Sequence, residues 1–216
     1  MRAATFGAMD GLVTNIALIA GVGGGGVAPD TIILAGVAGL IAGAISMGFG
    51  EYTSVKTQNE QIAREVARER AELLRNPDGE CEELARVWIE RGIAPDVARQ
   101  MAAALRDHPE EALRFHVQEE LGVSPDYAPS PWVAAFSSFT TFAVGALVPL
   151  LPYLFGATEL WLALSVGGLG LAAAGAIAAR FTGRPRWYAA GRQVLLGGAA
   201  ALATYLVGVL IGVAVT

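Results

Sequence analysis

Charged residues are scarce over most of this 216-residue chain. They make up only 16% of the sequence, and 27 of the 35 lie between Glu51 and Asp126. The sequence on either side is almost free of charge, and hydrophobic residues account for 54% of the whole chain. Soluble single domains do not have this distribution, so the composition predicts a membrane protein that carries one charged domain.

Several functional signatures are also absent. The single cysteine, Cys81, cannot form an intrachain disulfide, and its place in the charged segment suits a reducing compartment. No G-x-S-x-G or H-E-x-x-H motif is present, which argues against an enzyme. No Lys-Ser or Lys-Thr pair directly follows the glycine-rich stretch 21–26, which argues against a nucleotide-binding loop. A net charge of −5 argues against binding of nucleic acid. No resident cofactor is expected.

Five apolar segments are long enough to cross a bilayer as helices, which takes about 20 residues each. They cover residues 3–28, 30–50, 132–155, 160–181 and 189–215. The predicted fold is an all-α membrane protein in which residues 1–51 hold transmembrane helices 1 and 2 and residues 131–216 hold helices 3 to 5. Asp10 interrupts the first apolar segment, which argues against a secretory signal.

Basic residues predict the orientation, because they favour the cytoplasmic side of a membrane. The charged segment holds ten of them, and the others used here are Arg2, Arg184, Arg186 and Arg192. The connections 21–29 and 156–159 contain none. The N-terminus and the charged domain are therefore predicted to be cytoplasmic, with the C-terminus outside. Abundant Ala, Arg and Gly point to a bacterial plasma membrane.

The charged segment, residues 52–130, is predicted to form a helical domain between spans two and three. No Pro or Gly interrupts residues 52–74, so the second span is expected to continue out of the membrane as one helix. Three more helices are predicted at 78–91, 95–107 and 109–121, because Pro95 and Pro109 suit first-turn positions. No strand alternation is present.

Acidic side chains recur at helical spacing in this domain. Glu65, Glu69 and Glu72 would fall within about 60° of one another on one helix. Facing helices that hold iron or manganese present Glu and His inward, and carboxylate oxygen and imidazole nitrogen suit Mn(II), Fe(II) and Zn(II). The candidate metal ligands of the domain are Glu69, Glu72, Glu80, Glu83, His116 and Glu120.

A solvated helical surface would give a similar pattern. Glu and Arg would then alternate in water, and His116 would be a surface residue. Cys81, between Glu80 and Glu82, is either a soft ligand or without a role. The sequence alone leaves the metal-binding domain and the solvated surface open.

Asp10 is the exceptional residue of the membrane part. A carboxylate inside a span is expensive in hydrocarbon, and such residues usually mark an ion or proton pathway. A structural hydrogen bond to a neighbouring helix is the alternative. On span two, Gly39, Gly43, Met47 and Glu51 follow one another at intervals of four and form one stripe, so Met47 and Glu51 are further candidate ligands.

The chain resembles the vacuolar iron transporter family over nearly its whole length. The resembling segments are DGLVT at 10–14, GAISMGFGEY at 43–52, SFTTFAVGALVP at 138–149, and residues 195–212. The resemblance implies a homodimer of five-helix protomers, with a pathway along the dimer axis formed by spans one and two. It also implies exchange of Fe(II) for protons, and a cytoplasmic domain that collects metal before transfer.

The resemblance also implies residue roles. It matches Asp10 and Met47 to the membrane pathway, and it matches five glutamates to the metal-binding domain: Glu69, Glu72, Glu80, Glu83 and Glu120. Two positions depart from the pattern. Gly39 stands where the plant type has a membrane glutamate, and His116 and Val117 replace paired methionines, which would make the site harder and less rich in sulfur.

The sequence thus predicts a divalent metal transporter that moves Fe(II), and also Mn(II), out of the cytoplasm in exchange for protons. Its expected partners are a second copy of the chain, the lipid bilayer, metal ions and protons. The alternative is a membrane-anchored metal sensor or store that does not transport.

Overall fold

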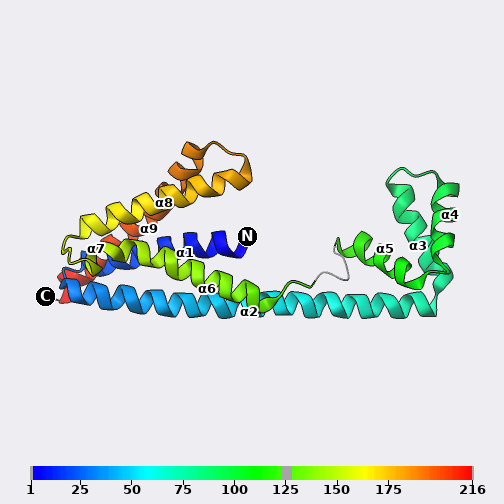
Figure 1. Ribbon diagram of the computed structural model, residues 1–216, viewed down its shortest axis with the longest axis horizontal. Coiled ribbons are helices and arrows are strands. Elements are labelled where there is room, and N and C mark those ends of the chain that lie inside the picture. Colours follow the sequence, from blue (N-terminus) through cyan, green and yellow to red (C-terminus); the bar gives the residue numbers. More distant parts are fainter. Residues whose placement is uncertain (1, 123–127, 216) are drawn as a thin grey trace. The chain divides into compact units, whose positions relative to one another are not determined.

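The computed structural model describes residues 2–122 and 128–215, and these are helical without strands (Figure 1). The chain divides into two compact units. The first comprises Met1–Thr53 and Pro131–Thr216, and the second comprises Ser54–Ser130. Within the described residues, five helical segments are long and apolar enough to cross a membrane. The predicted all-α membrane fold with five spans is confirmed.

The first unit contains α1 (Arg2–Gly24), the first part of α2 (Pro29–Arg75), α6 (Pro131–Leu147), α8 (Leu160–Thr182) and α9 (Arg186–Val215). α1 is central, since it packs against α6, α8 and α9. Small residues allow the close approach. A Cβ at Gly11 would overlap the carbonyl oxygen of Phe142, and one at Gly145 would overlap the carbonyl oxygen of Ala8.

The third span is not the single helix that the sequence predicted. α6 ends at Leu147 and is followed by a 3₁₀ turn, η1 (Val148–Leu150), and by the short helix α7 (Leu151–Leu154). Pro149 and Pro152 explain the interruption, because proline lacks the N–H that an α-helix needs and its ring clashes with the preceding turn. Leu150 is fully buried there and packs with Ile19 of α1 and Ile32 of α2.

The second unit contains the second part of α2, α3 (Pro77–Glu90), α4 (Pro95–Leu105) and α5 (Pro109–Leu121). α2 runs unbroken from Pro29 to Arg75, as the absence of Pro and Gly in residues 52–74 predicted. Asn76 caps α3, because its side-chain oxygen accepts a hydrogen bond from the Gly79 N–H at 3.2 Å. Leu84 and Trp88 of α3 pack with small residues of α4 to form the core.

Candidate metal centre

Three side chains from three helices converge in the second unit. Glu69 comes from α2, Glu80 from α3 and His116 from α5. The Nδ1 atom of His116 lies 3.1 Å from Oε1 of Glu69 and 3.8 Å from Oε2 of Glu80. The side chains of Glu69, Glu80 and His116 are 4%, 12% and 3% exposed. One nitrogen and two carboxylate oxygens therefore face one another in a site that is largely shielded from bulk water, and we call these residues the buried triad.

The local fold explains why these residues meet. α2 ends at Arg75, and the capped turn at Asn76 leads the chain away from the axis of α2 into α3 (Figure 1), whose first residues bring Glu80 close to Glu69. His116 is held by α5, whose Leu113 and Val117 are 3% and 1% exposed. Leu113 lies about one turn before His116 and Val117 directly follows it, so the imidazole belongs to a part of α5 that is packed into the core.

Burial also sets the charge of the imidazole. Removal from water lowers the pKa of His116 below its usual range, and the nearby Glu83 carboxylate offsets part of that effect. His116 is therefore neutral at pH 7 and keeps a lone pair for a metal. Two carboxylates buried beside a neutral imidazole are costly to keep ionised unless a cation lies between them. This environment favours binding of a divalent ion.

The distances fit such an ion. Two ligand atoms at about 2.1 Å from a metal, at 90° to 109° from each other, lie about 3.0 to 3.4 Å apart. The 3.1 Å separation of His116 from Glu69 falls in this range, and the 3.8 Å separation of His116 from Glu80 is slightly wider. The three ligand atoms all lie within 4.8 Å of one another, so a shift of the Glu80 carboxylate toward Glu69 and His116 would bring them into coordination.

An open acidic hollow of about 670 Å³ lies beside the triad. It is lined by Glu72, Glu80 and Glu83 together with Arg68, Arg75 and Asn76. Glu80 belongs both to this hollow and to the triad, so it connects the buried site to solvent. Arg68 contacts Glu65 at 3.2 Å and Glu72 at 3.8 Å, which neutralises part of the rim. Glu72 and Glu83 thus lie beside the triad and outside it.

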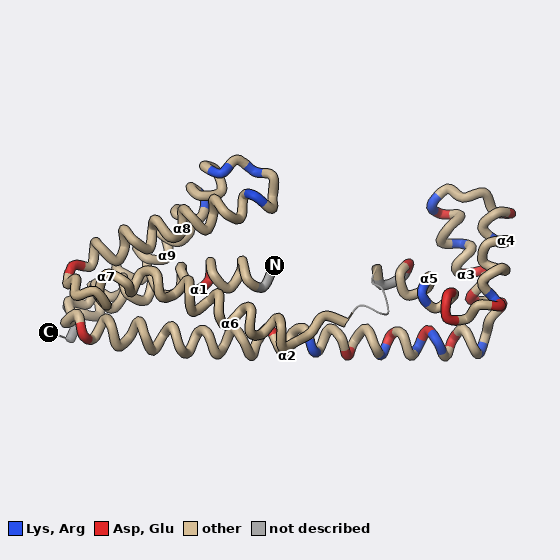
Figure 2. The backbone as a smooth tube through the Cα atoms, in the orientation of Figure 1, with Lys and Arg blue, Asp and Glu red and all other residues tan. Residues whose placement is uncertain are grey.

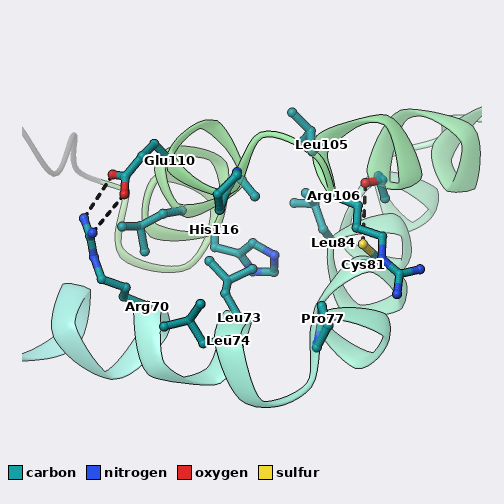
Figure 3. A pocket seen from close by; sticks show the side chains of 14 residues that line it. Arg70, Leu73, Leu74, Pro77, Cys81, Leu84, Leu105, Arg106, Glu110 and His116 are labelled. Carbon is teal, nitrogen blue, oxygen red and sulfur yellow. Dashed lines mark hydrogen bonds and ion pairs between the residues drawn. The ribbon is translucent and has the colours of Figure 1, made fainter.

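An apolar cavity of about 160 Å³ lies on the other side of His116 (Figure 3). Figure 3 shows the imidazole among Leu73 and Leu84, with Arg70 and Glu110 farther out. The Arg70 guanidinium donates two hydrogen bonds to the Glu110 carboxylate, at 2.8 and 3.0 Å. Leu73 and Leu84 thus help to shield the His116 imidazole from water.

The remaining sequence predictions for the domain have mixed outcomes. The expectation of His116 at the surface is wrong, because the residue is 2% exposed. Cys81 is outside the triad, and its thiol donates to the Ala102 carbonyl at 3.6 Å. Burial raises the pKa of Cys81, which keeps it a neutral thiol and a poor metal ligand. The side chain of Glu120 lies outside the described residues.

The membrane candidates Asp10, Met47 and Glu51 all lie in the first unit. Asp10 of α1 is half-buried and accepts a hydrogen bond from the Thr14 hydroxyl at 3.5 Å. Met47 of α2 packs against Phe142 and its neighbours in the core. Glu51 is partly exposed. Their metal-binding role stays a prediction.

Comparison with known proteins decides the family. The model of the VIT family matches residues 1–209. The chain belongs to the VIT family. Vacuolar iron transporter 1 of Tulipa gesneriana is 34% identical over 211 residues, which cover 95% of this chain and 84% of the tulip protein. The vacuolar iron transporter of Acanthamoeba castellanii is 36% identical over 208 residues, which cover 94% of this chain and 75% of that protein.

A shorter match extends the comparison. Vacuolar iron transporter 1 of Eucalyptus grandis is 39% identical over 158 residues, which cover 72% of this chain and 62% of that protein. These relatives are eukaryotic, so they lend no support to a bacterial plasma membrane, which stays a prediction. The cytoplasmic placement of the N-terminus and of the charged domain, and the placement of the C-terminus outside, also stay predictions.

One residue of this VIT-family chain was not singled out by the sequence as a site residue. Asn15 is 1% exposed, and its amide donates to the Ala146 carbonyl of α6 at 2.6 Å. Because that bond needs the N–H₂ group, the amide oxygen points the other way, and it has no hydrogen-bond partner among the described residues. A Cβ at Gly39 would lie 3.6 Å from this oxygen. A side-chain oxygen of α1 thus lies within van der Waals contact of position 39.

Proposed function

We propose that this VIT-family protein transports a divalent metal cation, Fe(II) and also Mn(II), out of the cytoplasm in exchange for protons. The buried triad is the observation that carries the proposal, since two carboxylates and a neutral imidazole within 4.8 Å of one another form a site for such an ion. Membership of a family whose members are named vacuolar iron transporters supports the same conclusion.

In this proposal the second unit is the cytoplasmic receiver. A hydrated ion is attracted to the acidic hollow, where Glu72 and Glu83 remain in water. Glu80 then passes it to Glu69 and His116, because only Glu80 lines both places. The ion loses water stepwise as carboxylate oxygens replace it. An imidazole in place of sulfur ligands favours the borderline ions Fe(II) and Zn(II) and the harder Mn(II) over the soft Cu(I).

The membrane step is assigned to a homodimer, with Asp10, Met47 and Glu51 along the route. Asp10 carries the only carboxylate of α1. A proton arriving from the far side would compete with the metal for the same carboxylate oxygens, and metal arriving from the cytoplasm would displace that proton. When metal and proton compete for the same carboxylate oxygens, the proton gradient alone can drive the exchange of metal for protons.

Metal flux into proteoliposomes tests the proposal. Purified protein is reconstituted with a proton gradient across the membrane, and Fe(II) entry is followed anaerobically with a trapped chelating dye. The native chain should give gradient-dependent flux, and Asp10→Asn should abolish it. Asp30→Asn is the matched control, because Asp30 is an exposed residue in the first turn of α2 and should leave the flux unchanged.

Two results would contradict the proposal. Flux that is indifferent to the proton gradient would exclude the exchange. Absence of flux in the native chain, with metal still bound by the triad, would favour the anchored sensor or store.

A further inference from the structure

We propose that the connection between α8 and α9 binds the phosphate of an anionic phospholipid headgroup. The two helices enclose a hollow of about 250 Å³ at this end of the first unit. Its lining residues are Thr182, Arg184, Tyr188, Ala189 and Arg192. Two arginines, a threonine and a tyrosine therefore line one space. A phosphodiester offers charge and acceptors that complement guanidinium and hydroxyl groups.

The charge of this region is strongly one-sided. No Asp or Glu occurs in residues 160–216, whereas Arg180, Arg184, Arg186 and Arg192 all lie at or near the connection. Figure 2 shows basic residues in blue at the connection between α8 and α9 and no acidic residue in red beside them. Within the described residues, no ion pair engages Arg184 or Arg192. Both guanidinium groups are thus available to an external anion.

The backbone explains why the two arginines converge. α8 ends at Thr182 and is capped by Gly183, whose φ of 65° is in the left-handed region, and α9 starts directly after Pro185. Arg184, Tyr188 and Arg192 follow at intervals of four, so that Tyr188 and Arg192 share one face of α9. The start of α9 is fixed against α8, since a Cβ at Gly175 would meet the backbone of Ala189 at 2.6 Å.

The surroundings favour a lipid over a soluble anion. Trp187 and Phe181 are 78% and 62% exposed beside the hollow, which is typical of aromatic residues at the level of lipid headgroups. Farther along α9, Leu195 and Leu196 are 74% and 61% exposed on a helix that is apolar enough to cross the membrane. A molecule with a phosphate at the hollow could therefore lay its acyl chains along α9. Basic pockets between transmembrane helices bind such headgroups.

Lipid titration of the full chain tests this site. The protein in neutral detergent micelles at about 150 mM salt, where charges beyond about 8 Å are screened, is titrated with phosphatidylglycerol that carries a fluorescent tail. We expect one saturable site per chain in the native protein. The double variant Arg184→Gln, Arg192→Gln should bind about tenfold or more weakly, since each basic contact at a headgroup contributes substantially.

Arg180→Gln, Arg186→Gln is the matched control, because it removes two charges from the same connection but outside the hollow. It should change the affinity by no more than about threefold at this salt concentration. Arg184→Lys, Arg192→Lys should restore part of the binding, because it returns the charge without the planar fork. All four arginines are exposed, so the variants should fold.

Three results would overturn the inference. Equal losses in the two glutamine double variants would mean attraction by net charge without a site. Equally tight binding of phosphatidylcholine would exclude recognition of the anionic headgroup. Displacement of the lipid by inorganic phosphate at equal concentration would mean that the hollow takes a soluble anion.

Discussion

Removal of one carboxylate charge from the buried triad should weaken metal binding by about 30- to 150-fold. Glu69→Gln keeps the size of the side chain and leaves a neutral oxygen in place. Even in a dielectric of about 80, one negative charge about 2.1 Å from a divalent ion contributes about 4 kcal/mol. The remaining amide oxygen offsets part of this energy, so that the net loss is about 2 to 3 kcal/mol.

Glu65→Gln is the matched control for this substitution. Glu65 lies one turn earlier on α2, its side chain is 28% exposed, and its partner is Arg68 at 3.2 Å. Both variants change one carboxylate to an amide on the same helix, so general electrostatic effects are the same. The affinity of the full chain for Mn(II) is measured by competition with a chromophoric chelator at pH 7. An affinity of Glu69→Gln within twofold of that of Glu65→Gln would refute the assignment of Glu69 as a ligand.

Other predictions concern single residues. Burial lowers the pKa of His116, so the imidazole binds a proton more readily when α5 is unfolded than when it is folded. Opening of α5 should therefore become easier as the pH falls below about 6.5. Hydrogen exchange of α5 amides checks this, and His116→Gln should remove the dependence between pH 7.5 and 5.5. Since burial raises the pKa of Cys81, iodoacetamide should modify it at least about tenfold more slowly in the native chain than in denaturant at pH 7.5, as followed by mass spectrometry. Gly11→Ala should destabilise the chain by about 1 to 3 kcal/mol, because the added Cβ would overlap the backbone of α6. Gly168→Ala should not destabilise it, because the space around Gly168 is open. Thermal unfolding in detergent measures both effects.

Helix positions were largely predictable from the sequence. Long apolar runs require helices in a membrane, because no other open structure satisfies the backbone hydrogen bonds there. The unbroken α2 followed from the absence of Pro and Gly in residues 52–74. The interruption at Val148–Leu150 was missed, although Pro149 and Pro152 were visible signals, because hydropathy alone does not register a lost N–H.

Periodicity could place each candidate ligand on a face of its own helix, but it could not tell which faces meet. Glu69 and Glu72 are equivalent by spacing, yet the turn at Asn76 buries Glu69 and leaves Glu72 at the open hollow. His116 was predictable in retrospect. It follows Leu113 by three positions and precedes Val117, so that it belongs to the buried stripe of α5, and a polar residue in such a stripe needs a partner.

The most direct test of the account is whether His116 touches the metal. The chain has only two histidines, His108 and His116, so nitrogen coupling to bound Mn(II) in pulsed electron paramagnetic resonance can be traced to one residue. If His116 is a ligand, imidazole nitrogen coupling is expected in the native chain and in His108→Gln, and it is lost in His116→Gln. Coupling that disappears in His108→Gln, or that is absent from the native chain loaded with one Mn(II), would contradict the buried triad as the metal centre.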